Sequence, residues 1–387
     1  MIRTCLILAA VTGSATASVG RAAAPVTVRD SAGLKAACAA AGPGTVIRLA
    51  PGDYQPGVFV GDRSGSPAAP IVIEGADPKR PPVFAGGNEA LHFTSCSHLV
   101  LRNVVIRGQK DNGLNIDDGS RPGSAHHILV ENVRVEDVGP QGNHDAIKLS
   151  GLDDFEIRDC TFHGWGGQGI DMVGCHRGLI AGCTFIGKQG FTQNTGLTAK
   201  GGSREITVRR CRFDRAGDRA INAGGSTGDP FFRPLDAPYE AAAITVEGCT
   251  FHGGETPIAF VGVDGAVFRC NTVHDPGKWI CRMLQERAEP RFTRCRNVRI
   301  ERNLFVFQAA KLGDPVNIGG GTEPKTFVFA DNLWFAADKP AASRLRLPVA
   351  EQGGVHGVDP KLEAPEKGSF KPLAAAAAGY GATALAP

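Results

Sequence analysis

A short motif recurs along most of this chain, and its repeat length constrains the fold more than any other feature. Each copy begins with an aliphatic or aromatic residue, carries a Cys, Asn or Val at its fourth position, and ends on an apolar residue. The copies begin at Leu101, Val130, Ile157, Ile180, Val208, Val246, Ile300 and Phe329. The clearest intervals are 23, 28 and 29 residues, with one of 38 between Cys211 and Cys249. A unit of this size without a helical period is typical of one coil of a β-solenoid.

Identical positions in successive coils are expected to lie one strand spacing apart, about 4.8 Å. The motif therefore predicts ladders of identical side chains that point inward. These ladders contain Cys160, Cys183, Cys211 and Cys249 in one case, and Asn303 and Asn332 in the other. We interpret the cysteines as small buried groups and not as metal or redox ligands. Oxidation of neighbouring cysteines to a disulfide stays open from the sequence.

The ends of the repeat predict where the domain begins and ends. Residues 31–41 indicate a capping helix with Ser31 as its N-cap, followed by a first strand at 44–49 and a turn at 51–54. We therefore expect an all-β fold with an N-terminal capping helix: one right-handed parallel β-helix over residues 25–373. An Ala-rich and poorly ordered tail is expected over residues 374–387.

The N-terminus predicts export. Residues 1–24 combine a positive start at Arg3, an apolar stretch and a run of small residues, which indicates a signal peptide and a secreted or periplasmic protein. No later apolar run is long enough for a membrane span. The formal net charge is only +3 and no Lys/Arg block stands out, which argues against nucleic acid as a partner.

A second repeated strand lies between the copies of the motif. Because side chains alternate along a strand, one set points into the core. The inward set is Leu114, Ile147, Ile170, Leu197 and Ile221. The first outward column is Asn115, Lys148, Asp171, Thr198 and Asn222, and the second is Asp117, Ser150, Val173 and Lys200. The residues just before these strands add His144, Asp145, Asn194, Asp218 and Arg219. Arg282 continues the first column if residues 280–284 form the matching strand.

These columns are either a solvated face with surface ion pairs or a binding site. We favour a binding site because the polar residues gather on consecutive coils, whereas Ala259 and Val261 occupy the later positions. The 38-residue coil inserts residues 226–239, which include Phe231, Phe232 and Tyr239. This insertion is either an aromatic wall for a ligand or a flexible surface loop.

With its strands placed in this way, the chain resembles the pectin-lyase-like β-helix superfamily, and especially polysaccharide lyase families 6 and 9. The repeat resemblance covers residues 26–335. Residues 198–203 are similar to the strand that carries the catalytic lysine of family 6, which makes Lys200 the matching residue. Residues 145–151 are similar to the lysine strand of family 9, where Lys148 matches.

The chain departs from both families at the implied calcium site. Gln193 and Thr195 stand where family 6 has calcium-binding glutamates. Gly224 occupies the column of the partner arginine of that family, and the nearby Arg219 is a candidate substitute. The resemblance to family 9 implies a Ca²⁺ cofactor, for which hard oxygen donors are suited. The candidate ligands are Asp117, Asp145 and Asp171.

The resemblance implies β-elimination on an acidic polysaccharide that contains uronic acid. A cation neutralises the uronate carboxylate, and a base removes the neighbouring C5 proton. Lys200 is the expected base and Lys148 the second candidate, since Asp171 beside Lys148 would raise the pKa of that lysine. His144 or Arg219 is expected to assist the carboxylate or the leaving group. The expected substrate-binding residues are Asn115, Asn194, Asn222, Arg282 and Tyr239.

Other functions stay open at this point. A glycoside hydrolase would use Asp145 and Asp171 as acid and base. A C5-epimerase would start with the same proton abstraction, and a β-helix that only binds carbohydrate would have the same polar face. We expect a monomer. His126 and His127 are interpreted as turn residues and not as ligands.

Overall fold

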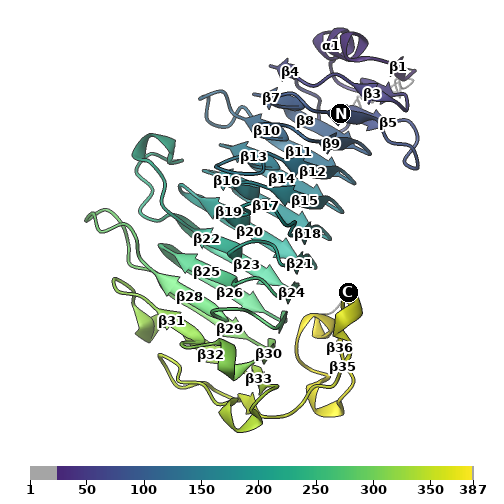
Figure 1. The fold of residues 1–387 in the computed structure, drawn as a ribbon. Coiled ribbons are helices and arrows are strands. Elements are labelled where there is room, and N and C mark those ends of the chain that lie inside the picture. The colour runs from purple at the N-terminus through teal and green to yellow at the C-terminus, as the bar shows by residue number, and fades with distance from the viewer. Residues whose placement is uncertain (1–23, 386–387) are drawn as a thin grey trace, which may run out of the picture.

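Three long sheets wind around one core in the computed structural model, which describes residues 24–385 (Figure 1). The three sheets are called A, B and C. The strands within each sheet pair in parallel, and each coil passes through sheet C, then sheet A, then sheet B. The α-helical part is α1 (Ser31–Ala39), at the N-terminal end. The predicted parallel β-solenoid with a capping helix is confirmed.

The strands of the three sheets lie in the following spatial order. Sheet A consists of β1 (Val26–Val28), β2 (Val46–Leu49), β5 (Ile71–Gly75), β8 (Ser97–Arg102), β11 (His126–Glu131), β14 (Asp153–Arg158), β17 (His176–Ala181), β20 (Ser203–Arg209), β23 (Ala241–Glu247), β26 (Val263–Arg269), β29 (Arg296–Glu301) and β32 (Val328–Ala330). Sheet B consists of β3 (Asp53–Tyr54), β6 (Val83–Ala85), β9 (Val105–Arg107), β12 (Arg134–Val138), β15 (Thr161–Trp165), β18 (Thr184–Ile186), β21 (Arg212–Asp214), β24 (Thr250–His252), β27 (Thr272–His274), β30 (Leu304–Phe307), β33 (Leu333–Ala336) and β34 (Val355–His356). Sheet C consists of β4 (Val58–Gly61), β7 (Leu91–Thr94), β10 (Leu114–Asp117), β13 (Ile147–Ser150), β16 (Gln168–Val173), β19 (Thr195–Lys200), β22 (Arg219–Gly224), β25 (Thr256–Val261), β28 (Cys281–Leu284) and β31 (Val316–Ile318).

Short elements complete the chain. The hairpin at the C-terminal end pairs β35 (Leu362–Ala364) with β36 (Ser369–Pro372). The 3₁₀ turns are η1 (Asp229–Phe231), η2 (Ala309–Lys311), η3 (Pro324–Thr326), η4 (Pro340–Ala342), η5 (Pro365–Lys367), η6 (Ala375–Ala377) and η7 (Ala382–Ala384). Within residues 24–385, no helix has both the length and the apolar character that a bilayer span requires.

Identical side chains stack along the core, as the motif predicts. The ring centroids of Phe162 and Phe213 each lie 4.7 Å from that of Phe185, in stacked geometry. The ten cysteines in the described part of the chain are buried and not joined by disulfides, which confirms their interpretation as core thiols. Burial raises the pKa of thiols such as Cys175, to about 12, so that they stay protonated and unreactive.

The asparagine ladder is longer than the sequence pattern predicts. Asn303 Nδ2 donates to Asn332 Oδ1 at 2.9 Å, and a third member, Asn271, donates to Asn303 Oδ1 at 3.2 Å. Glu351 Oε1 accepts from Asn332 Nδ2 at 2.8 Å and ends the ladder. Each buried amide thereby has a hydrogen-bond partner, which buried polar groups need.

Two details at the N-terminal end differ from prediction. The N-cap of α1 is Asp30, whose Oδ1 accepts from Gly33 N at 2.7 Å, and not Ser31. Ser31 instead donates from its hydroxyl to Gln55 O at 2.8 Å, which ties the helix to the first coil. Residues 53–54, expected in a turn, form β3 because they pair with β6.

The tail after residue 373 also differs from prediction, because it is packed. Ala377 is fully buried in an apolar cluster on the outer face of sheet B. The cluster members from that sheet are Leu304, Val306, Leu333 and Phe335. Figure 1 shows this C-terminal segment, in yellow, folded back beside the last coils. These outward apolar side chains need a cover, and the tail supplies it. Residues 1–23 lie outside the described residues, so the signal peptide stays a prediction.

Candidate active site

The predicted polar columns lie side by side on sheet C. The first column pairs in register through Asn115, Lys148, Asp171, Thr198 and Asn222, and continues through Ala259, Arg282 and Asn317. The second column pairs Asp117, Ser150, Val173 and Lys200. The inward set, from Leu114 to Ile221, is fully buried. The stacking register is therefore confirmed, including the position of Arg282 on β28.

Two lysines and two aspartates form a compact charge cluster, in which Lys148, Asp171 and Lys200 come from these columns and Asp145 comes from the segment just before β13. Lys148 Nζ donates to Asp171 Oδ2 and lies 3.4 Å from Asp145 Oδ2. Lys200 Nζ lies 3.2 Å from Asp171 Oδ1. Both carboxylates are buried, whereas the two lysine side chains keep partial exposure. Asp145 Oδ1 also accepts from Gln168 N at 2.8 Å.

The cluster shifts the pKa values of two of its members. Burial, and then the charge of Asp171, raises the pKa of Asp145 to about 6. Burial alone would lower the pKa of Lys148, but Asp171 and Asp145 outweigh it and raise that pKa, as predicted. Lys148 therefore keeps its proton and serves as a counter-ion that fixes both carboxylates.

The three aspartates expected to bind calcium are not gathered into one site. Asp117 Oδ2 lies 2.5 Å from His92 Nε2, and this pair raises the pKa of His92 to about 9. The carboxylate oxygens of Asp117, Asp145 and Asp171 do not all lie within 4.8 Å of one another. The lysines already neutralise the other two aspartates. These residues do not fit a Ca²⁺ ion in this arrangement, and no step below uses one.

A cleft of about 350 Å³ opens next to this cluster, over the later coils of sheet C. Its charged lining residues are four basic and two acidic side chains: Lys200, Arg219, Lys278, Arg282, Asp218 and Glu255. Its other lining residues are Gln168, Asn194, Thr195, Thr198, Asn222, Gly225, Ser226, Thr256 and Trp279. The excess of cations favours an anionic ligand.

Two guanidinium groups in the cleft lack a carboxylate partner. Among the described residues, no carboxylate oxygen lies within 4.0 Å of Arg219 or Arg282. Burial, and then the positive charge of Arg219, lowers the pKa of Arg282. The guanidinium carbon of Arg282 lies 4.6 Å from the centre of the Trp279 ring. Two neighbouring arginines that are partly desolvated and lack a carboxylate partner suit a ligand that carries a carboxylate.

Unused hydrogen-bonding groups concentrate in the same cleft. Five buried polar atoms of its lining have no hydrogen-bond partner in the part of the chain described. They are Gln168 Oε1, Thr198 Oγ1, Asn222 Oδ1, Thr256 Oγ1 and Arg282 Nε. Since buried polar groups are nearly always hydrogen-bonded, this concentration indicates a ligand rich in donors and acceptors.

The structure brings five of the predicted site residues into the cleft and leaves others outside. Those inside are Lys200, Arg219, Asn194, Asn222 and Arg282. Outside, Asn115 Nδ2 donates to Glu89 Oε1 at 2.5 Å, and His144 Nδ1 lies 3.7 Å from Asp111 Oδ1. Lys148 does not line the cleft and lies in the charge cluster on β13. Asn115 and His144 therefore do not contribute to this cleft, because both lie on earlier coils.

The insertion at residues 226–239 does not form the expected aromatic wall. Tyr239 packs against a separate apolar cluster that contains Phe232 and Phe292. Phe231 is exposed and does not line the cleft. The insertion contributes only Ser226 to the lining. It is held against the body of the protein, since Arg233 Nε lies 3.3 Å from the buried Asp118.

Several lining residues were missed by the sequence analysis. Gln168, Thr195 and Thr256 pair in register with Arg219, which was predicted, two positions before the inward column. This third column has the sequence parity of the inward residues, so alternation alone would have placed its side chains in the core. Trp279 lies before β28 and outside any repeat, and no sequence signal pointed to it.

The fold and the cleft define a parallel β-helix with a cationic cleft. Residues 89–232 match the family described as "Right handed beta helix region", which confirms the handedness. No curated protein matches the chain.

Solved structures with the same fold have diverse functions. The mannuronan C-5 epimerase AlgE6 A-module of Azotobacter vinelandii has a TM-score of 0.53 at 16% identity, over 86% of this chain and 96% of that one. An alginate lyase from Paenibacillus sp. str. FPU-7 has a TM-score of 0.50 at 16% identity, over 77% of this chain and 99% of that one. PfbA, a surface adhesin of Streptococcus pneumoniae, has a TM-score of 0.50 at 9% identity, over 80% of this chain and 84% of that one. The resemblance to the pectin-lyase-like superfamily is thus confirmed for the fold.

Proposed function

We propose that this protein cleaves a polysaccharide containing uronic acid by β-elimination in the cleft on sheet C. The observation that carries the proposal is the pair of guanidinium groups, Arg219 and Arg282, that lack a carboxylate partner and lie in the same cleft as Lys200. A uronate carboxylate matches their charge and their planar donors.

The first step is neutralisation of the carboxylate. Arg219 and Arg282 bind it and stabilise the negative charge that develops when the C5 proton leaves. They supply the positive charge that a metal ion would otherwise provide, which agrees with the poor fit of calcium to the aspartates. The unpaired oxygens of Thr198, Asn222 and Thr256 accept hydrogen bonds from the sugar hydroxyls.

The second step is abstraction of the C5 proton by Lys200, which must enter this step as the free amine. The electrons of the C5–H bond form the C4–C5 double bond, and the bond between C4 and the glycosidic oxygen breaks. Asp171 orients the lysine at 3.2 Å, and Lys148 shares the charge of Asp171, so Lys200 does not face an uncompensated carboxylate. Asp218 lies in the cleft with its pKa raised by burial and by Glu255, and it is our candidate to protonate the leaving oxygen.

The geometry gives less support to a glycoside hydrolase that uses Asp145 and Asp171. Both carboxylates are fully buried and held by lysines, so they cannot flank a glycosidic bond. Epimerisation at C5 shares the first proton transfer, and the assay must separate it from elimination.

The test incubates the full chain with alginate, polygalacturonate and a neutral glucan, each with and without EDTA. We expect ultraviolet absorbance from unsaturated ends with at least one uronate, none with the glucan, and no loss in EDTA. Lys200→Ala should abolish product, whereas Lys188→Ala, at a half-buried ion pair with Asp137 outside the cleft, should retain it. Deuterium at C5 without unsaturated ends would indicate an epimerase, and binding without turnover a carbohydrate-binding protein. Full activity of the Lys200 variant would refute the base assignment.

A further inference from the structure

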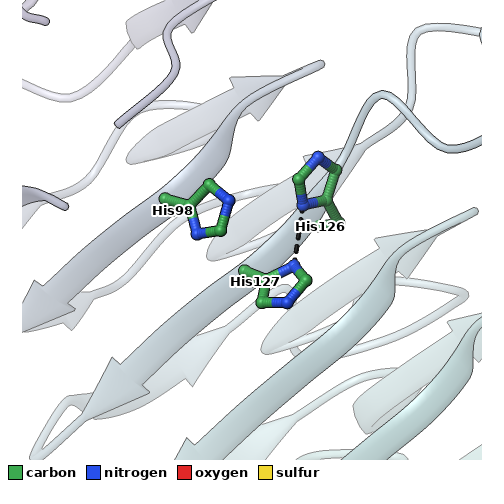
Figure 2. A group of neighbouring side chains, drawn as sticks. All are labelled: His98, His126 and His127. Atoms are coloured by element: carbon green, nitrogen blue, oxygen red, sulfur yellow. Dashed lines mark hydrogen bonds between the residues drawn. The ribbon is translucent and has the colours of Figure 1, made fainter. Parts of the chain in front are cut away.

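A cluster of three histidines lies on the outer face of sheet A, on a different sheet from the cleft. His98 comes from β8, and His126 and His127 come from the start of β11 (Figure 2). The interpretation of His126 and His127 as turn residues is therefore wrong. One ring nitrogen from each histidine lies within 4.8 Å of the others, and this is the one such group of three or more potential ligands among residues 24–385.

The backbone explains why consecutive histidines face the same side. In a regular strand, neighbouring side chains point to opposite faces. His127 has a left-handed backbone with φ of 53°, and His98 has φ of 48° at the equivalent position one coil earlier. Such a residue interrupts the regular alternation of side chains, which turns His127 to the outer face beside His126. Asp154 and Arg177 have the same left-handed backbone at the equivalent positions of the next coils.

The three rings are in direct contact. The ring centroid of His98 lies 4.6 Å from that of His127 and 5.2 Å from that of His126. His126 Nδ1 and His127 Nδ1 lie 2.8 Å apart, as the dashed line in Figure 2 shows. A hydrogen bond between two imidazoles requires that one nitrogen is unprotonated, so a lone pair is already aimed into the cluster.

The acidic residue at the position equivalent to His127 on the next coil is engaged by an arginine. Asp154 is held by Arg177 through two hydrogen bonds of 2.6 and 2.9 Å. Neutral imidazole is the form that binds metal ions.

We propose that His98, His126 and His127 bind a transition-metal ion, with Zn²⁺ or Ni²⁺ as the suited chemistry. Imidazole nitrogen is a preferred ligand of both ions. Zn–N bonds of about 2.0–2.1 Å place tetrahedral ligand nitrogens about 3.4 Å apart, which small ring rotations reach from the present arrangement. The ion takes the place of the proton shared by His126 and His127, and water completes its coordination. Because the ligands come from β8 and β11, the ion joins two successive coils and stabilises the fold.

The test uses the full chain without a polyhistidine tag, stripped with EDTA and dialysed. Calorimetric titration with ZnCl₂ and NiCl₂ should show one bound ion per chain, and Zn²⁺ should raise the midpoint of thermal unfolding. His98→Gln and His127→Gln should each weaken binding by more than about tenfold and remove the thermal shift. Both side chains reach the surface, and circular dichroism will verify that these variants fold.

The matched control is His252→Gln. His252 and His274 form a similar pair, with Nδ1 atoms 3.0 Å apart, but they stack under Phe370 and have no third imidazole. This variant should bind as the wild type does. The proposal is overturned if the wild type takes up no ion, if both cluster variants keep wild-type affinity, or if the control alone loses binding.

Discussion

Replacement of Arg282 by Gln separates the function of this side chain from its effect on stability. Arg282 has a buried Nε without a partner, repels Arg219, and is held by the face of Trp279. The unsatisfied donor costs about 1–3 kcal/mol, and the cation–π contact returns about 0.5–1 kcal/mol. We therefore expect Arg282→Gln to leave the free energy of unfolding unchanged or to raise it by up to about 2 kcal/mol.

The same change should reduce activity strongly. A charged hydrogen bond to the uronate carboxylate contributes about 1.5–3 kcal/mol, which corresponds to a fall in kcat/KM of about 10- to 150-fold. Steady-state rates on the accepted uronate and urea unfolding of the same samples test both parts. The control is Arg299→Gln, an exposed arginine on sheet A that pairs with Glu301, and it should keep wild-type kcat/KM. Unchanged kcat/KM, or a large loss of stability, in Arg282→Gln would refute the assignment of Arg282 as a carboxylate-binding residue.

Two further predictions concern the charge cluster. Asp171→Asn removes the carboxylate between Lys148 and Lys200, so urea unfolding should show that the free energy of unfolding falls by about 3 kcal/mol. This is the lower end for a broken buried pair, because both lysines retain some water. A change within error of zero would contradict the structural role of the cluster. The pKa of Asp145 is about 6 in the fold against 3.8 in an unfolded chain, so the folded state holds this proton more tightly and its contribution to stability falls as pH rises from about 4 to about 6. The stability of Asp145→Asn minus that of the wild type should therefore increase over this range, and a flat difference would argue against the raised pKa.

Much of the candidate site follows from the coil repeat and from the alternation of side chains along each strand. Once the coil repeat was aligned, alternation along the strand was enough to place Lys148, Asp171 and Lys200 on one face, and the register pairs them so. The same alignment placed Arg282 in the first outward column, where the register has it. The third column, with Gln168 and Thr256, was not within reach of that reasoning, because it has the sequence parity of the inward residues.

Other parts of the site were beyond it. The contact of Arg282 with Trp279 joins a strand to the loop before it, and loop conformation has no period. The calcium requirement stays a prediction, because matching residue types do not specify which carboxylates are already neutralised. Asp117 is held by His92 from the preceding coil, a partner that no motif indicated.

The sequence by itself determined the solenoid, the inward ladders and the face that carries Lys148, Asp171 and Lys200. It did so because the recurring motif, combined with a strand period of two, leaves one register that buries the inward apolar positions of successive coils. Only the tertiary structure decided which charges are paired, which guanidinium groups stay free, and that three histidines meet on sheet A. Those outcomes depend on local backbone conformation, loops and side-chain directions, which arise from packing between coils and not from any one coil.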